Sequence, residues 1–480
     1  MTRQRLFGLI VALLLIVLSW WGVVSARSGL VVQELEHNKV PMLYVAPQKG
    51  EKLPGVLVAH GFAGSKQLML GYAHVLAHAG YAVMLWDFGG HGANASPLNS
   101  LQHDLDIAYN ALLKQPKVEK GSLALLGHSM GSGAVMSASI SNPNRFAATV
   151  AVSPTGAQVT RFAPRNLLLQ AGSWEGSFIA NAERLLVAAG GENKNLASGN
   201  GRSLEIIPNA EHITILFRNA SHQSALRWLD DTFAKSHTSS YVDRRMLWYG
   251  LHLLAWLLLL GTIAPFVAAP ATTDKVIRPL TSWGGLLIAP FVASGVLNLV
   301  SRVGEIESLG GLMVGGAVGI WFFVAGIVWL SILFRLPRPT LRAVGIGIAF
   351  FGLLWVAFGA MAQLVWLQWW LIPPRLLLWP LLSLACLPWF VASGVAQQSA
   401  GIGRRVIWWL GQSTALIAGL YLALYLLPQL SFIFLLLPLF PPLIGILSYA
   451  AAQLNEVWSY ALGSALFFGW MLAAAFPLAG

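Results

Sequence analysis

Charged side chains are scarce in this sequence, since Asp, Glu, Lys and Arg make up 10% of its 480 residues while hydrophobic residues make up 56%. Soluble globular proteins carry about 25% charged residues. The scarcity is uneven: apolar segments follow one another after residue 246, whereas residues 29–234 have an ordinary mixed composition. The composition excludes a single soluble domain and indicates a membrane protein with two parts.

Cysteine is almost absent as well. The one cysteine, Cys386, lies within an apolar segment. This excludes an internal disulfide and a metal cluster held by several thiolates.

Acidic residues are fewer than basic ones, and the formal net charge is +11. The surplus lies mostly outside residues 25–240, which hold 17 Lys and Arg against 14 Asp and Glu. Positive charge next to apolar segments is typical of membrane topology and not of a phosphate-binding surface. We therefore expect no nucleic-acid partner.

The N-terminal segment is apolar and long enough to cross a bilayer. Residues 6–24 contain no charged side chain, and Trp20 and Trp21 suit a membrane interface. We predict a signal anchor over residues 1–24. A cleaved signal peptide is the alternative, because small residues at 24–26 resemble a cleavage site.

The C-terminal part, residues 241–480, is predicted to be a transmembrane domain of about eight helices. Basic residues gather in alternate connections, for example Arg335, Arg338 and Arg342, which favours a cytoplasmic N-terminus. The protein is then a multi-pass protein of the inner or plasma membrane with residues 25–240 outside the cytoplasm. The predicted spans are about 246–268, 281–300, 312–334, 343–366, 376–397, 406–427, 430–450 and 458–478.

Residues 25–240 alternate between apolar strand candidates and helical patterns such as Lys66–Ala79. This alternation predicts an α/β fold with a mostly parallel sheet and helices on both faces, and it places ligands at the carboxyl ends of the strands. The predicted strands are Val40–Val45, Gly55–Ala59, Ala82–Trp86, Ser122–Leu126, Ala147–Val152, Asn166–Gln170 and Ser203–Ile207.

The motif that organises this domain is Gly-His-Ser-Met-Gly at residues 127–131, between a predicted strand and a predicted helix. A serine at the tip of such a turn is a nucleophile elbow, with small flanking residues where strand and helix approach closely. Ser129 is the candidate nucleophile. A backbone N–H of the His-Gly-Phe-Ala-Gly loop, that of Phe62, joins the N–H of Met130 as a candidate oxyanion donor.

Together these motifs resemble the α/β-hydrolase family. The resemblance covers residues 40–235 and includes the loops after the strands, the elbow, a Gly-x-x-Glu turn ending at Glu175, and a late histidine, His212. It implies Ser129 as nucleophile, His212 as base and Glu175 as the acid that orients the base. This chemistry requires no cofactor and no metal.

Two alternatives concern histidines. His222 is the rival base. It lies within a helical pattern, whereas His212 lies in a loop. His74 and His78 have the spacing of metal ligands on one helix face, but no third ligand accompanies them.

The sequence thus predicts a membrane-bound serine hydrolase of the esterase or lipase type that cleaves an ester or thioester of a lipid-like substrate. The alternatives are an acyltransferase, or a transporter or assembly protein whose hydrolase-like domain only binds. Too few residues lie between Ser153 and the next predicted strand, Asn166–Gln170, to form a lid domain. The outer loops 302–311 and 367–375 are therefore predicted to cover the site.

The topology has a direct test. A reporter enzyme that works only after export, fused near residue 240, should be active because Arg3 and Arg5 hold the N-terminus in the cytoplasm. The measurement is reporter activity in whole cells, with a fusion after residue 340 as the inactive control. An inactive fusion at residue 240 combined with an active cytoplasmic reporter there would reverse the orientation.

Overall fold

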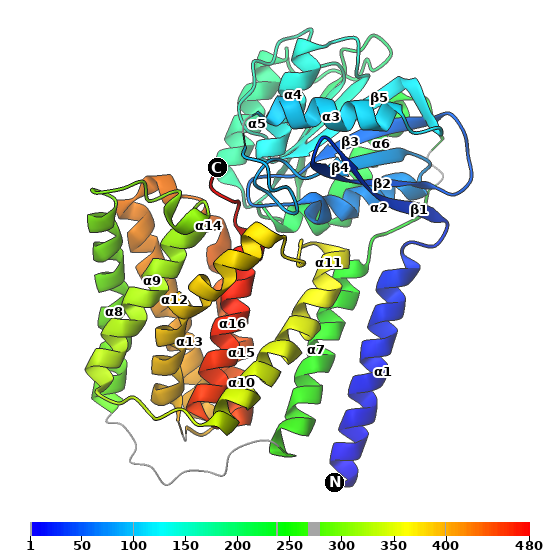
Figure 1. Ribbon diagram of the computed structural model, residues 1–480. Helices are drawn as coiled ribbons and strands as arrows, with labels where there is room; N and C mark the ends of the chain where they lie inside the picture. Colours follow the sequence, from blue (N-terminus) through cyan, green and yellow to red (C-terminus); the bar gives the residue numbers. More distant parts are fainter. Residues whose placement is uncertain (1, 99, 237–238, 267–278, 399) are drawn as a thin grey trace. The chain divides into compact units, whose positions relative to one another are not determined.

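The computed structural model describes residues 2–98, 100–236, 239–266, 279–398 and 400–480, and the chain forms two compact units (Figure 1). The sheet unit consists of Trp21–Tyr249, Ala362–Trp370 and Gly480. The helical unit consists of Met1–Trp20, Gly250–Met361 and Leu371–Ala479.

The sheet unit contains one eight-stranded sheet in the order β1-β2-β4-β3-β5-β6-β7-β8. The pairs β1–β2 and β2–β4 are antiparallel, and all other neighbours are parallel. The mostly parallel sheet predicted from the sequence is confirmed. The strands are β1 (Leu30–His37), β2 (Val40–Pro47), β3 (Leu53–Ala59), β4 (Ala82–Trp86), β5 (Val118–His128), β6 (Ala148–Val152), β7 (Leu167–Gly172) and β8 (Arg202–Ile207).

The sequence analysis missed strand β1. This strand pairs only with β2, at the edge of the sheet, and most of its side chains are exposed or half-buried. It carries Gln33, Glu34 and Glu36, so it lacks the apolar run that identified the other strands.

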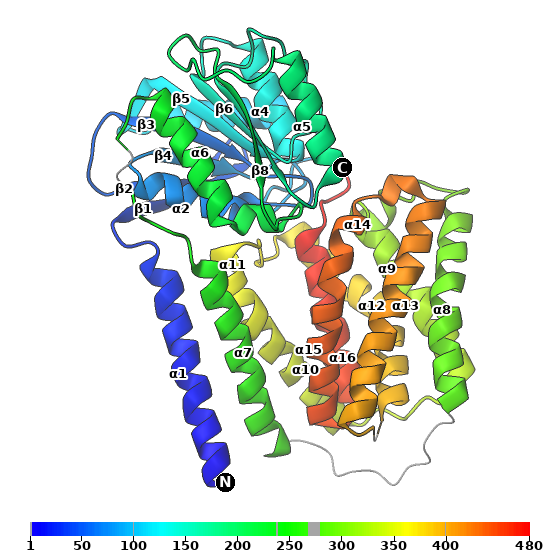
Figure 2. The same cartoon turned by 180° about the vertical axis from the view of Figure 1, so that it is seen from behind.

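Helices cover both faces of the sheet, as Figures 1 and 2 show. Alternate strand residues supply the two cores: Val56 and Val58 pack on the side of α2 (Leu70–His78) and α6 (Asn219–Thr232), whereas Leu57 packs on the other side. That second side carries α3 (Leu101–Leu113), α4 (Met130–Ser141) and α5 (Gly176–Ala188). The sheet is therefore buried on both faces.

Nine helical segments among the described residues are long and apolar enough to cross a membrane. They fall where the sequence predicts spans, although the last two residues of the predicted span 246–268 lie outside the described residues. The segments are Arg3–Ser25, Arg245–Phe266, Leu280–Val300, Gly315–Leu333, Leu341–Val365, Pro373–Gln397, Ile402–Leu426, Ile433–Leu454 and Val457–Ala475.

The helices of these segments are interrupted in two places. A π-helical turn, Trp355–Ala360, separates α10 (Leu341–Leu354) from α11 (Met361–Val365), and short turns separate α14 (Ile433–Leu436) from α15 (Phe440–Leu454). The remaining long helices are α1 (Arg3–Ser25), α7 (Arg245–Ile263), α8 (Pro279–Val300), α9 (Gly315–Leu333), α12 (Pro373–Gln397), α13 (Ile402–Leu426) and α16 (Val457–Ala475).

A largely buried ion pair lies where the sheet unit leads into α7. The Arg245 guanidinium donates from Nη2 to Asp243 Oδ2 at 2.6 Å and from Nε to Asp243 Oδ1 at 2.8 Å. Burial alone would raise the pKa of Asp243, but the adjacent guanidinium lowers it to about 2. Arg245 is thus a paired charge held in the sheet unit.

Replacing Asp243 by asparagine should destabilise the sheet unit, because it leaves the Arg245 charge buried without its carboxylate. The loss should be on the order of 3 kcal/mol, or roughly 10 °C in melting temperature for a unit of this size. Thermal unfolding of the solubilised full-length protein measures it. Asp106→Asn, which breaks an exposed ion pair with Arg145, is the control and should cost under about 1 kcal/mol.

The difference in melting temperature between Asp243→Asn and the unmodified protein should also depend on pH. The folded-state pKa of Asp243, about 2, lies below the unfolded-state pKa of about 3.9. The carboxylate therefore makes its full contribution to stability when the pH is above the unfolded-state pKa. This contribution is lost as the pH falls through about 2. A difference in melting temperature that does not narrow below about pH 4 would contradict this account of the pair.

Candidate active site

Ser129 occupies the turn between β5 and α4 with backbone angles φ +52° and ψ −120°. Two glycines allow this turn. A Cβ on Gly127 would lie 2.3 Å from the carbonyl oxygen of Gly131, and a Cβ on Gly131 would lie 2.5 Å from that of His60. The glycine spacing in the motif therefore follows from the close approach of strand and helix.

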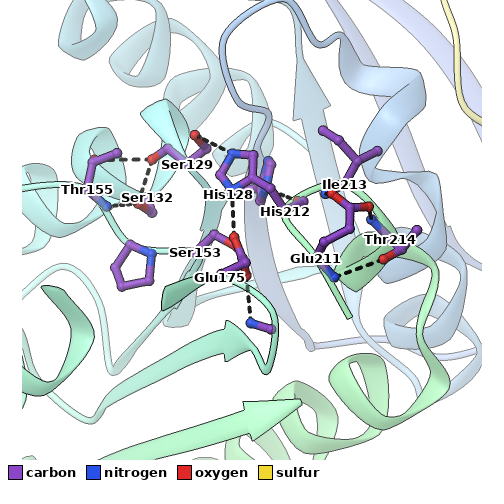
Figure 3. Close-up of polar contacts among 12 residues, drawn as sticks. His128, Ser129, Ser132, Ser153, Thr155, Glu175, Glu211, His212, Ile213 and Thr214 are labelled. Atoms are coloured by element: carbon purple, nitrogen blue, oxygen red, sulfur yellow. Dashed lines mark hydrogen bonds and ion pairs between the residues drawn. The ribbon is translucent and has the colours of Figure 1, made fainter. Parts of the chain in front are cut away.

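His212 lies in the loop after β8, and its Nε2 is 3.0 Å from Ser129 Oγ (Figure 3). Glu211 fixes this loop: its carboxylate accepts hydrogen bonds from the backbone N–H groups of Ile213 and Thr214, and its own N–H donates to Thr214 Oγ1. The imidazole stacks on the ring of Phe178 with centroids 4.3 Å apart. Backbone bonds and packing thus hold the ring toward the serine.

Glu175 follows β7 and lies on the far side of His212. Its Oε1 is 2.7 Å from His212 Nδ1, and both side chains are buried. Its Oε2 accepts hydrogen bonds from Ser153 Oγ at 2.9 Å and from the Gly172 N–H at 2.6 Å. Because a carboxylate only accepts, Nδ1 carries the imidazole proton and Nε2 is left to accept from the serine hydroxyl.

A pocket of about 690 Å³ opens beside Ser129. Phe62 and Met130, whose N–H groups were predicted to bind an oxyanion, are both in its wall. Met130 is the first residue of α4, and the first N–H groups of a helix have no partner within the helix. The other lining residues are Ser100, Leu101, Gln102, Gly133, Ala134, Ser137, Thr155 and Gly156.

The sequence of residues 51–236 matches a family profile described as serine aminopeptidase, S33. The sheet unit is an α/β-hydrolase domain. This confirms the family resemblance stated from the motifs. The matched residues include all three side chains that the structure brings together at Ser129, and they end before the first apolar helix of the C-terminal part.

Solved structures similar to this chain include hydrolases of low sequence identity. Dienelactone hydrolase from Anabaena variabilis is 21% identical over 42% of this chain and 95% of its own, with a TM-score of 0.34. A membrane phospholipase A described as a bacterial virulence factor is 15% identical over 48% of this chain and 99% of its own, with a TM-score of 0.31. No curated protein matches the chain in sequence.

Asp87 and His91, on the loop after β4, form hydrogen bonds that hold this loop in place. Asp87 accepts from Lys66 Nζ at 2.5 Å, from the Lys66 N–H and from the Ala93 N–H. Burial opposes its ionisation, but Lys66 and these bonds keep the pKa of Asp87 below its ordinary value. His91 Nδ1 is bonded to the Gly89 carbonyl oxygen at 2.8 Å.

The rival histidines have other partners. His222, on α6, bonds through Nε2 to the Leu216 carbonyl oxygen at 2.7 Å and packs against Tyr72. His74 Nδ1 bonds the Leu70 carbonyl oxygen, and His78 Nε2 bonds that of Ala26. In the part of the chain that the structure describes, no three His, Cys, Asp or Glu side chains form a group that could hold a metal ion.

Two contributors to the site were not identified from the sequence. Ser153, directly after β6, donates to Glu175, and its position at a strand end was the available signal. His128, which directly precedes Ser129 in the motif, bonds through Nε2 to the His212 carbonyl oxygen at 2.9 Å. Burial, with His212 nearby, keeps the pKa of His128 well below its ordinary value, so the ring is neutral and Nε2 is the donor.

Proposed function

We propose that the hydrolase domain is a serine esterase that works through Ser129, His212 and Glu175 and an acyl-enzyme. The observation that carries the proposal is the continuous hydrogen-bonded series from Ser129 Oγ through His212 to Glu175, with distances of 3.0 and 2.7 Å. A domain that only binds has no need for a serine, a base and an acid aligned in this way. The series also opens on a pocket large enough for a small organic ester.

In this mechanism His212 Nε2 takes the proton of Ser129 as Oγ attacks the carbonyl carbon of the ester or thioester. Glu175 holds the imidazole in the tautomer with a proton on Nδ1 and stabilises the imidazolium. The N–H groups of Phe62 and Met130 donate to the tetrahedral oxyanion, and His212 then protonates the leaving group. Water, activated by the same histidine, releases the acid and restores the serine.

The experiment compares variants of the full-length protein on a soluble ester. Ser129→Ala and His212→Ala should each lower kcat by on the order of 10⁶, whereas Glu175→Gln should lower it less, by on the order of 10⁴, because the acid orients the base without taking the proton. The measurements are steady-state kinetics and covalent labelling by a fluorophosphonate, which requires an activated serine.

The control is His222→Ala, which removes the rival histidine and should retain activity if the protein folds. Labelling that persists in Ser129→Ala would refute the nucleophile. If His222→Ala is inactive and His212→Ala is active, His222 on α6 is the general base. No labelling of the unmodified protein would favour a binding role, such as a transporter or assembly protein.

We further propose that the substrate is a lipid-like ester and that the hydrolase domain lies outside the cytoplasm. Nine apolar helical segments among the described residues favour a location at the membrane, where lipid esters are concentrated. Phe62, Leu101 and Met130 give the pocket an apolar part for an acyl group. An acyltransferase would use the same acyl-enzyme, with an alcohol in place of water.

The lipid proposal predicts that a long-chain ester carried in phospholipid vesicles is hydrolysed with a higher kcat/KM than a short water-soluble ester. The measurement uses the purified full-length protein reconstituted into the same vesicles, with Ser129→Ala as the blank. Faster hydrolysis of the short ester would contradict a lipid substrate. Adding a soluble alcohol distinguishes the acyltransferase, because transfer would then yield a new ester in preference to the free acid.

A further inference from the structure

Residues Ala362–Trp370, here the 362–370 segment, lie between two apolar helical segments in the sequence but belong to the hydrolase domain in space. Val365, Leu367 and Trp369 are buried. Trp366 packs against the core that includes α2 and α6. The segment is therefore a built-in part of the domain, although more than 120 residues separate it from α6.

Hydrogen bonds within the segment fix its glutamines. Gln363 Oε1 accepts from the N–H groups of Trp369 and Trp370 at 2.6 and 3.2 Å. Gln368 Nε2 donates to the Trp370 carbonyl oxygen at 2.9 Å. With its nitrogen engaged in this way, the Gln368 amide presents its oxygen Oε1 as an acceptor.

That oxygen accepts a hydrogen bond from Gln67 Nε2 at 2.7 Å, and both side chains are buried. Gln67 lies in the short helical turn Lys66–Met69, which follows the predicted oxyanion loop. A second bond ties the segment to the domain, since Arg245 Nη1 donates to the Leu364 carbonyl oxygen at 3.2 Å. Arg245 is itself held by Asp243.

The turn that carries Gln67 is linked to the loop at residues 60–64 by direct contacts. Leu68 packs against Gly64, where an added Cβ would lie 3.1 Å from Leu68 Cδ2, and the Gly64 N–H donates to the Gly61 carbonyl oxygen at 3.0 Å. Gly61 in turn lies against Ser129, since its Cβ would be 3.0 Å from that of the serine. These contacts connect Gln67 to the backbone around Phe62.

A glutamine at position 67 is not explained by its contribution to the stability of the fold. Among the described residues, Gln67 Oε1 has no hydrogen-bond partner although it is buried. A buried amide with an unsatisfied oxygen is disfavoured relative to an apolar side chain of similar shape. The bond to Gln368 is therefore the feature for which the glutamine is needed.

We propose that Gln368 is a positioning residue of the hydrolase: through Gln67 it fixes the loop at residues 60–64, whose Phe62 N–H binds the oxyanion. This proposal rests on the proposed function. The oxyanion exists only in the transition state and the tetrahedral intermediate, so a displaced loop weakens catalysis and leaves ground-state binding of the ester intact. The rate on a soluble ester then depends on the 362–370 segment as well as on residues 25–240.

The test measures kcat and KM of the full-length protein on a short soluble ester for Gln67→Met, Gln368→Ala and the double variant. Methionine fills the volume of Gln67 without its amide, so folding is preserved. Each single variant should lower kcat about tenfold and leave KM within about twofold of the unmodified value. This loss is smaller than the roughly 10²–10³-fold loss of kcat that follows removal of an oxyanion donor, because the donor is displaced and not removed. The double variant should be no slower than the slower single variant, because both remove one interaction.

The matched control is Gln223→Ala, which removes a glutamine on α6 that bonds the Tyr241 carbonyl oxygen, and kcat should be unchanged. The fraction of protein labelled by a fluorophosphonate at saturation should equal that of the unmodified protein in every variant. An unchanged kcat in Gln67→Met, losses that multiply in the double variant, or a lower kcat explained by a smaller labelled fraction would each overturn the proposal. Absence of labelling in the unmodified protein would instead refute the proposed function.

Discussion

The sharp turn at Ser129 is the constraint on which the site depends. A non-glycine residue at positive φ is strained, and such a conformation costs roughly 1–3 kcal/mol. The structure holds it with the Ser129 N–H bonded to the Val152 carbonyl oxygen and with the Ser129 carbonyl oxygen bonded to Ser132 and Thr155. Strand, helix and neighbouring strand together fix where the hydroxyl points.

The parallel strands then bring the other groups to the same edge of the sheet. Glu175 follows β7 and His212 follows β8, so two connections that are separate in the chain converge on the turn after β5. The Glu175 carboxylate is buried, and three donors, including Ser153, surround it. Buried carboxylates require such partners, because an unpaired charge away from water is strongly disfavoured.

The hydrolase domain is not limited to one stretch of the chain. The 362–370 segment contributes core side chains and the Gln368 bond, and Arg245 connects that segment to Asp243. The connection between β6 and β7, residues 153–166, contains no helix, so no separate lid domain lies there. The first residues of the loop 367–375 pack within the hydrolase domain, and the pocket beside Ser129 is lined by residues between Phe62 and Gly156. That this loop covers the site stays a prediction.

The sequence alone determined the long apolar helical segments, the alternation of strands and helices, and the Ser129 motif, because each depends on residues close together in the chain. It missed β1, whose exposed edge gives no apolar run. The set Ser129, Glu175 and His212 came from family resemblance, and the structure brings these residues together. Only the tertiary structure revealed the hydrogen bond from Ser153 to Glu175 and the one from Gln67 to Gln368. The two residues of each pair are 22 and 301 positions apart in the chain. The physical reason is that a hydrogen bond depends on distance in space, and folding alone sets that distance between remote residues.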